Sequence, residues 1–216
     1  MKKQKSSMLS KILLLLLLPI TILSQNKFLN TDAYQSLYSD KYNQPLMVKY
    51  KLYKGGGECS RQSFRFKDDK YTNVSESDYA KSGYDMGHMC NAEDMAYDCV
   101  KEESTFRFYN CCPQMTKLNR GVWKHWETKI RELSQTDSLV IICGPLFLST
   151  ETEYIKSDSK VVLPSHFYKI VYSQTSKKII MCMLFNNKGL ITKKDITISY
   201  LKSIIDKDVI NYLKLN

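Results

Sequence analysis

Two stretches of the chain decide the fold and carry most of its candidate site residues: YDMGHMCNAED at residues 84–94 and FYNCCPQMTKLNRGVWKHWE at residues 108–127. In the first stretch His88 directly follows Gly87, a residue that lets backbone or substrate come close to the imidazole. A neutral imidazole is suited to taking a proton from water as a general base. His88 is therefore a catalytic candidate, although a histidine after glycine is also common in purely structural roles.

The second stretch offers side-chain oxygens from Asn110, Gln114, Asn119 and Glu127. Asn119 and Glu127 are eight residues apart, which on a helix separates them by about 12 Å along the axis, so both can hardly ligate one ion directly. If one metal is present, Asn119 could bind it while Glu127 holds its waters. Such an oxygen-rich site suits Mg²⁺ better than zinc. The competing interpretation of Asn119 is an ordinary helix N-cap.

Around these stretches the hydrophobic pattern alternates between strand and helix periods. Apolar runs and turn signals predict strands at 46–54, 106–110, 138–143, 167–173 and 178–185. Helical spacing predicts a helix at 119–133, with Val122, Trp126, Ile130 and Leu133 on its apolar stripe, and a terminal helix after Asp195. We find no internal repeat and no region of clearly different amino-acid composition, so we predict a single domain that mixes helices and strands.

Length, composition and charge agree with a single globular domain that has an anionic partner. The chain has 216 residues, of which 43% are hydrophobic and 25% charged, enough for an ordinary core. Collagen-like, coiled-coil and wholly disordered chains are excluded by this composition. The formal charge is +10, and it falls to +6 without the first 24 residues, which contain four lysines and no acid. A basic domain favours a polyanionic partner.

The start of the chain predicts export. Lysines within residues 2–11 precede an almost wholly apolar run at 12–23, after which polar sequence begins. A membrane-spanning helix is the alternative, but it needs about 20 apolar residues. We therefore expect a signal peptide at 1–24, a domain at 25–216, no membrane association after cleavage, and a periplasmic or extracellular location.

Seven cysteines would then meet an oxidising compartment, in which disulfides persist. The odd number leaves at least one thiol unpaired within the chain, and the sequence leaves the pairing open. Cys143 and Cys182 stand in apolar runs and could equally be buried thiols. A zinc site is disfavoured because the chain lacks a paired CxxC motif and has only three histidines.

Four segments in order, YDMGHMCNAED, FYNCCPQMTKLNRGVWKHWE, IICGPLF and VLPSHFYKIVY, resemble the DNA/RNA non-specific endonucleases of the ββα-metal group. The resemblance spans roughly residues 46–186. It implies an α+β fold, a single mixed domain with a central antiparallel sheet and a ββα-metal element. It also implies that His88 is the catalytic histidine, that Asn119 binds the magnesium and that Glu127 supports the metal's waters.

Further site residues follow from the same resemblance. Asn110 and Gln114 are expected beside the site, and with Asp85 they are expected to contact substrate. Arg61 matches an upstream arginine that steadies the transition state, although it could also be a solvated surface residue. The family's usual arginine in D-R-G-H is Met86 here, so either another cation substitutes, with Arg61, Arg65 and Arg107 as candidates, or turnover is slower.

The function implied by the resemblance is magnesium-dependent hydrolysis of DNA and RNA without sugar or sequence specificity, leaving 5′ phosphates. Mn²⁺ is expected to substitute for Mg²⁺, and no obligate protein partner is indicated. The main alternative is an exported nucleic-acid-binding protein of the same fold with weakened catalysis, as Met86 could suggest. A disulfide-rich interaction protein is a third interpretation, but seven cysteines in 216 residues are too sparse for a scaffold without a core.

Overall fold

The computed structural model describes residues 26–67, 69–156 and 158–213. The predicted signal peptide at 1–24 lies outside these residues. No helix in the described part of the chain is both long enough and apolar enough to cross a membrane.

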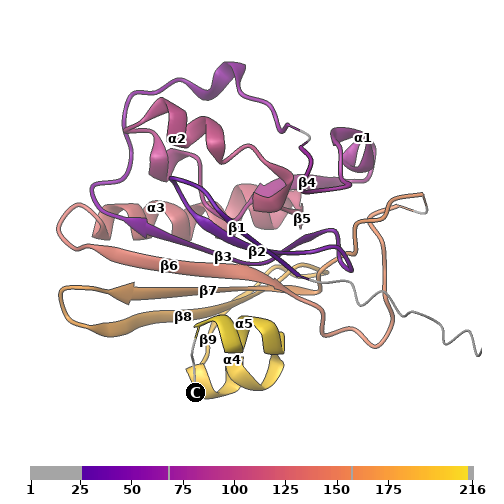
Figure 1. The fold of residues 1–216 in the computed structure, drawn as a ribbon. Helices are drawn as coiled ribbons and strands as arrows, with labels where there is room; N and C mark the ends of the chain where they lie inside the picture. The colour runs from indigo at the N-terminus through magenta and orange to yellow at the C-terminus, as the bar shows by residue number, and fades with distance from the viewer. Residues whose placement is uncertain (1–25, 68, 157, 214–216) are drawn as a thin grey trace, which may run out of the picture.

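A seven-stranded sheet, antiparallel at every pairing, forms the centre of the molecule (Figure 1). The strand order is β1-β2-β3-β6-β7-β8-β9. The strands are β1 (Lys27–Asn30), β2 (Gln35–Ser39), β3 (Gln44–Leu52), β6 (Leu139–Leu146), β7 (His166–Ser173), β8 (Lys178–Asn186) and β9 (Lys193–Asp195). The predicted α+β class with a central antiparallel sheet is therefore confirmed.

The two faces of the sheet carry different elements (Figure 1). One face carries a two-stranded ribbon, β4 (Tyr84–His88) and β5 (Cys111–Met115), with the helices α1 (Glu76–Tyr79), α2 (Cys99–Ser104) and α3 (Lys124–Leu133). The other face carries α4 (Ile198–Ile204) and α5 (Lys207–Leu213). Short turns complete the first face: η1 (Arg61–Ser63), η2 (Glu93–Met95), η3 (Phe108–Asn110) and η4 (Leu118–Trp123).

Each face has its own hydrophobic core. On the ribbon side Trp123 is fully buried and meets Phe167 and Phe185 edge-on, with ring centroids 5.7 and 5.1 Å apart. On the other side Leu201 and Val209 of the terminal helices pack with sheet residues. The predicted packing of the terminal helix on the sheet is confirmed, although the helix is interrupted between Ile204 and Lys207.

Two strand predictions need correction. In place of the strand predicted at 106–110, residues 108–110 form a turn, in which the buried Asn110 side chain bonds the backbone of Cys90 and Thr105, and the strand follows as β5. Pro113 lies inside β5, where the two-stranded ribbon tolerates a residue without an N–H donor. Strand β6 also continues through Gly144 to Leu146, and at Gly144 a Cβ atom would stand 2.2 Å from the Leu46 carbonyl oxygen.

The helix predicted at 119–133 has a wide first turn, η4, before α3 begins at Lys124. Its buried face is also rotated relative to the predicted stripe. Trp123, Glu127 and Ile130 are buried, whereas Leu133 is 40% exposed. The prediction assigned only apolar residues to the buried face of the helix, whereas the carboxylate of Glu127 lies on that face.

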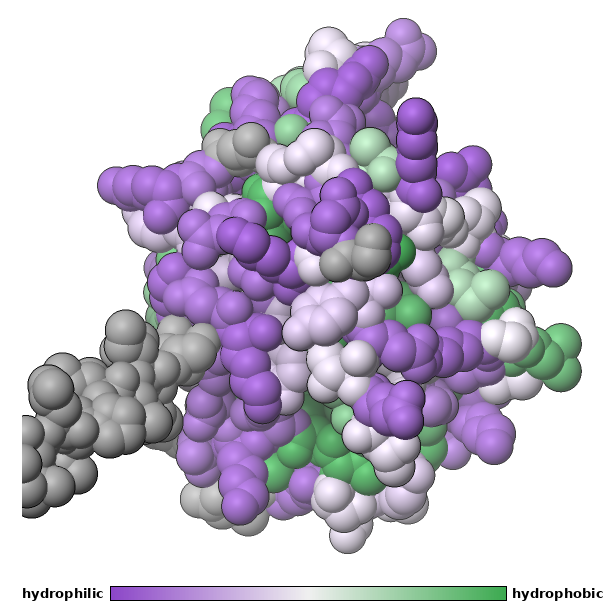
Figure 2. Space-filling model, turned by 90° about the vertical axis from the view of Figure 1, so that its right-hand side faces the viewer, coloured by the Kyte–Doolittle hydropathy of each residue, from purple (hydrophilic) through white to green (hydrophobic). Residues whose placement is uncertain are grey.

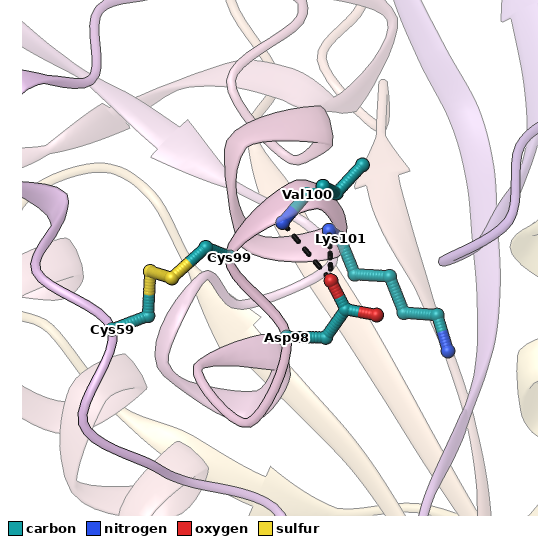
Figure 3. Close-up of a disulfide and its surroundings, with 5 residues drawn as sticks. All are labelled: Cys59, Asp98, Cys99, Val100 and Lys101. Carbon is teal, nitrogen blue, oxygen red and sulfur yellow. Dashed lines mark hydrogen bonds between the residues drawn. A yellow bond between two sulfur atoms is a disulfide. The ribbon is translucent and has the colours of Figure 1, made fainter.

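A disulfide between Cys59 and Cys99 ties the loop before β4 to the start of α2 (Figure 3). Asp98 caps this helix, since its Oδ1 accepts hydrogen bonds from the backbone N–H groups of Val100 and Lys101 at 3.0 and 3.2 Å. The other five cysteines, Cys90, Cys111, Cys112, Cys143 and Cys182, are buried thiols. The loop that carries Arg61 is thus covalently anchored two residues before that side chain.

Candidate active site

The ribbon and the helix after it form a ββα element. In the ribbon Asp85 pairs with Gln114, Gly87 with Cys112, and His88 with Cys111. A Cβ atom at position 87 would lie 2.1 Å from Oε1 of Gln114, so any larger residue there would force this buried side chain to move. The chain leaves β5 and passes through η4 into α3, which brings Asn119 and Glu127 back towards the end of β4.

One cavity of about 420 Å³ brings together four predicted site residues, His88, Arg61, Asn119 and Glu127. They come from separate parts of the chain: strand β4, turn η1, turn η4 and helix α3. The other lining residues are Asn91, Ala92, Glu93, Arg120, Lys124, Thr128 and Arg131. Four of the lining residues are cationic and two are acidic, so the cavity is suited to an anionic ligand. We call this space the catalytic cavity.

His88 is held by aromatic packing. Its ring lies 4.7 Å from the Phe66 ring and 4.6 Å from the Phe106 ring, centroid to centroid. Nε2 is buried and has no hydrogen-bond partner among the described residues. Burial, with a smaller contribution from the charge of Arg61, lowers the pKa of His88 to about 3. The imidazole of the free protein is therefore neutral throughout the physiological range and able to accept a proton.

Asp85 holds two neighbouring side chains in place. Its carboxylate accepts hydrogen bonds from Asn119 Nδ2 at 3.0 Å and from Nε and Nη2 of Arg120, both at 2.9 Å. Burial opposes ionisation, but the bonds from Arg120 and Asn119 prevail and lower the pKa of Asp85. Its carboxylate thus positions Asn119 and Arg120. Asp85 also lines a second cavity, which contains Met86, and its contact with substrate stays a prediction.

Asn110 and Gln114 lie inside the protein, contrary to the prediction that they contact substrate. Both are fully buried. Asn110 Oδ1 accepts a bond from the backbone N–H of Cys90 at 2.7 Å, and its Nδ2 donates to the carbonyl oxygens of Cys90 and Thr105 at 3.0 and 2.8 Å. Gln114 packs beneath Gly87. The Asn110 side chain therefore fixes the backbone at Cys90, two residues after His88. Neither polar atom of the Gln114 side chain has a hydrogen-bond partner among the described residues.

Glu127 lies against a buried cation, Lys169 of β7. The Lys169 Nζ is 3.6 Å from Glu127 Oε1 and 3.9 Å from the centroid of the Trp123 ring. Both side chains are almost fully buried, and neither Nζ nor Oε1 has a hydrogen-bond partner in the described part of the chain. Burial raises the pKa of Glu127, while Lys169 opposes this shift. Lys169 therefore favours the ionised form of a carboxylate that lines the catalytic cavity.

Replacing Lys169 by methionine is expected to lower the free energy of unfolding by about 3 kcal/mol at pH 8, because the Glu127 charge is left buried without a partner. The loss should be smaller at pH 5. This is because a carboxyl group whose pKa is raised in the folded protein contributes to the free energy of unfolding while it is protonated, and that contribution is lost as the pH rises through its pKa in the folded state. Urea unfolding at both pH values measures this difference, with the exposed Lys178→Met as the control. Equal losses at both pH values would contradict the role given to Glu127.

Two residues of the site were missed by sequence reasoning. Lys169 is the one charged residue among the apolar residues of β7. This charge was the only signal in the sequence for its burial beside an acidic residue. Arg120 follows Asn119 directly, was not among the cations considered for the missing arginine, and lines both the catalytic cavity and a second cavity that contains Met86. Arg61 does not line the cavity of Met86, and neither does Arg107, whereas Arg65 does.

Comparison with known proteins found a matching family model and several similar nucleases. Residues 20–211 match the model of the DNA/RNA non-specific endonuclease family. The mitochondrial Endonuclease G of Bos taurus is 31% identical over 154 residues, covering 64% of this chain and 52% of that protein. Nuclease C1 of Cunninghamella echinulata is 30% identical over 159 residues, covering 67% and 63%. The chain thus spans about half the length of the cattle enzyme.

The fold is shared with a solved structure, that of the EndoG/EndoGI complex, at a TM-score of 0.72 with 82% of each chain covered. Sequence identity in this comparison is 22%, so it shows the fold alone. The predicted periplasmic or extracellular location is contradicted, because several of the relatives, the cattle enzyme included, are named as mitochondrial nucleases.

The family match extends over nearly the whole described chain, and it covers the ββα element with the four residues of the catalytic cavity. The relatives include nucleases from animals and fungi. The chain therefore belongs to the DNA/RNA non-specific endonuclease family, whose members are metal-dependent nucleases.

Proposed function

We propose that this protein is a magnesium-dependent endonuclease that hydrolyses phosphodiester bonds of DNA and RNA and leaves 5′ phosphates. The observation that carries the proposal is the convergence of His88, Asn119, Glu127 and Arg61 on one cavity. These side chains offer a neutral base, two oxygen donors and a cation. That set matches what attack of water on a phosphodiester requires.

The residues present fit a magnesium ion. Asn119 directs its Nδ2 to Asp85, which leaves the amide oxygen available to an ion. Glu127 Oε1 is a buried oxygen that lacks a hydrogen-bond partner among the described residues, on a side chain that lines the same cavity. Amide and carboxylate oxygens with water are the ligands that Mg²⁺ prefers. Asn119 would hold the ion and Glu127 its waters, and the bound ion would supply charge neutralisation at the phosphate.

The protein's own residues account for the proton transfer. His88 takes a proton from a water molecule, and the resulting hydroxide attacks phosphorus. The bond from phosphorus to the 3′ oxygen breaks, the 3′ oxygen leaves and takes a proton from solvent, and the phosphate stays on the 5′ side of the cut. The nearby phosphate charge raises the low pKa of His88 once substrate is bound, which makes the imidazole a stronger base at that moment. Arg61 faces the same cavity and neutralises negative charge that develops on the phosphoryl oxygens. Asp85 keeps Asn119 in position throughout.

Indifference to base and sugar follows when contacts are made mainly to phosphate, which positions a nucleic acid but carries little sequence information. Arg61, Arg120, Lys124 and Arg131 provide such contacts in the catalytic cavity. With a formal charge of +10, the protein should also bind nucleic acid with marked salt dependence.

A plasmid-nicking assay tests the proposed function. The full chain should convert supercoiled plasmid to nicked and linear forms with Mg²⁺, lose this activity in EDTA and regain it when Mg²⁺ is added in excess. Product ends should accept label from polynucleotide kinase only after phosphatase treatment, because they carry 5′ phosphate. Binding of plasmid without cleavage under any metal condition would instead indicate a nucleic-acid-binding protein that has lost catalysis.

A further inference from the structure

The loop after β3 brings Arg61 to the catalytic cavity with few contacts to the rest of the protein. It runs over the top of the molecule, above α2 (Figure 1). All three residues of the turn η1, which contains Arg61, are described, and none of them is buried. Figure 2 shows mostly hydrophilic residues over the top of the molecule, with small hydrophobic areas between them. Hydrophobic packing therefore does not fix the turn itself.

Two contacts fasten the loop on the side before Arg61. The disulfide between Cys59 and Cys99 joins it to the start of α2 (Figure 3). The backbone N–H of Cys59 also donates to the Ala96 carbonyl oxygen at 3.2 Å. Within the described part of the chain, this is the only backbone hydrogen bond that joins residues 58–66 to another segment. The disulfide is thus the strongest attachment of the loop near Arg61.

The charge of Arg61 acts on α2 as well as on the catalytic histidine. Burial lowers the pKa of His88, and Arg61 lowers it further. Burial and the charge of Glu93 raise the pKa of Glu102, and Arg61 opposes this rise. Glu102 is fully buried and lies three residues after Cys99, on the same side of α2. The guanidinium is therefore placed between the disulfide-linked helix and His88.

We propose that the disulfide between Cys59 and Cys99 is a positioning element of the active site, which holds the Arg61 guanidinium beside the scissile phosphate. This inference rests on the proposed function for the role of Arg61. Arg61 follows Cys59 by two residues, so the chain between them spans at most about 7 Å. A displacement of about 1 Å at a reacting group can cost about 100-fold in rate.

Without the disulfide, little would keep Arg61 at this place. The remaining attachments are the hydrogen bond from Cys59 to Ala96 and the packing of Phe64 on Phe106, with ring centroids 5.5 Å apart. These two contacts lie on either side of the turn, and neither involves Arg61. The loop should then stay near the protein while the guanidinium samples many positions.

The test is a double-mutant cycle between the disulfide and Arg61. Initial rates of plasmid nicking at saturating Mg²⁺ are measured for the wild type, Cys59→Ser/Cys99→Ser, Arg61→Ala and the triple variant. Arg61→Ala should lower the maximal rate about 100-fold or more. Loss of the disulfide should lower it about 10- to 100-fold when Arg61 is present, and less than about twofold when Arg61 is absent. The plasmid concentration for half-maximal rate should change little.

Reduction of the wild type with a phosphine gives the same comparison without a substitution, because the other five cysteines are already thiols. It should lower the nicking rate to that of the double-serine variant, whose own rate should not respond. Trypsin cleavage after Arg61, which reports the anchorage of the loop without catalysis, should become faster on reduction. Cys182→Ala is the matched control, since it removes a buried thiol from β8 on the other face of the sheet. It should behave as the wild type in both assays.

Three outcomes would overturn the positioning role. The first is an equal fractional loss of rate with and without Arg61, because a disulfide that only stabilises the fold acts on both backgrounds alike. The second is unfolding of the whole protein on reduction, seen by circular dichroism. The third is a wild type that nicks at an unchanged rate after reduction. A wild type that nicks no plasmid would instead overturn the proposed function, and with it the role of Arg61.

Discussion

His88→Ala is expected to lower the rate of metal-dependent plasmid nicking about 10²- to 10⁴-fold, the usual cost of losing a positioned general base. Binding of nucleic acid should change little, because the cations of the catalytic cavity remain. Initial nicking rates at saturating Mg²⁺ measure the loss, and oligothymidylate binding in EDTA measures what is retained. His125→Ala serves as the control, since His125 is exposed on α3 and does not line the cavity.

The same variant has a second expected effect, on acid stability. In the unfolded chain a histidine takes up a proton below about pH 6.5, whereas folded His88 does so only near its pKa of about 3. Between these values the unfolded state binds more protons, so the free energy of unfolding of the wild type decreases as the pH falls. His88→Ala lacks this contribution and should lose less stability between pH 7 and pH 4.

For the nicking assay, more than a tenth of wild-type activity in His88→Ala would show that His88 is not the general base.

Asn119→Ala is expected to raise the Mg²⁺ concentration needed for half-maximal activity and to lower the maximal rate, by about 100-fold or more in combination. Glu127→Ala should act in the same direction but less severely, because residues that act through metal-bound water typically contribute about 10- to 100-fold. Mg²⁺ titrations of nicking by the two variants decide the order. Asn73→Ala, an exposed amide away from both cavities, is the control.

The order of the two effects is the critical outcome. If Glu127→Ala were the more damaging change at saturating Mg²⁺, the ion would be held mainly by Glu127, and Asn119 would only position it. Such a result would also give Lys169 a larger role, since that lysine lies against the carboxylate.

Four strands of the central sheet, β3, β6, β7 and β8, were predictable because they are apolar runs with clear ends, and they lie close to the predicted ranges. The strands β1, β2 and β9 were not predicted. The turn at 108–110 was not predictable, because Phe108 and Tyr109 have strand propensity, while the Asn110 side chain bonds the backbone of Thr105 and of Cys90, which lies 20 residues earlier. Local propensity carries no information about such bonds.

At the site, motif order indicated His88, Asn119 and Glu127, but it did not distinguish residues that face the cavity from residues that build its walls. Gln114 lies beneath Gly87 because β5 pairs with β4 and directs that side chain inwards. The role of Asp85 in positioning Asn119 and Arg120 is likewise not indicated by motif order. The burial of Lys169 follows from the position of β7 under α3, which is a property of the whole fold.

The contact between Lys169 and Glu127 joins a central strand of the sheet to the helix of the active site. The spacing between these two layers is set by Trp123, Phe167 and Phe185. A substitution that reduces or increases the volume of these core side chains moves the Glu127 carboxylate without changing any residue that lines the catalytic cavity. In this protein, substitutions that loosen the packing of the core should therefore also impair catalysis. We expect such variants to lose turnover at temperatures well below those at which they unfold.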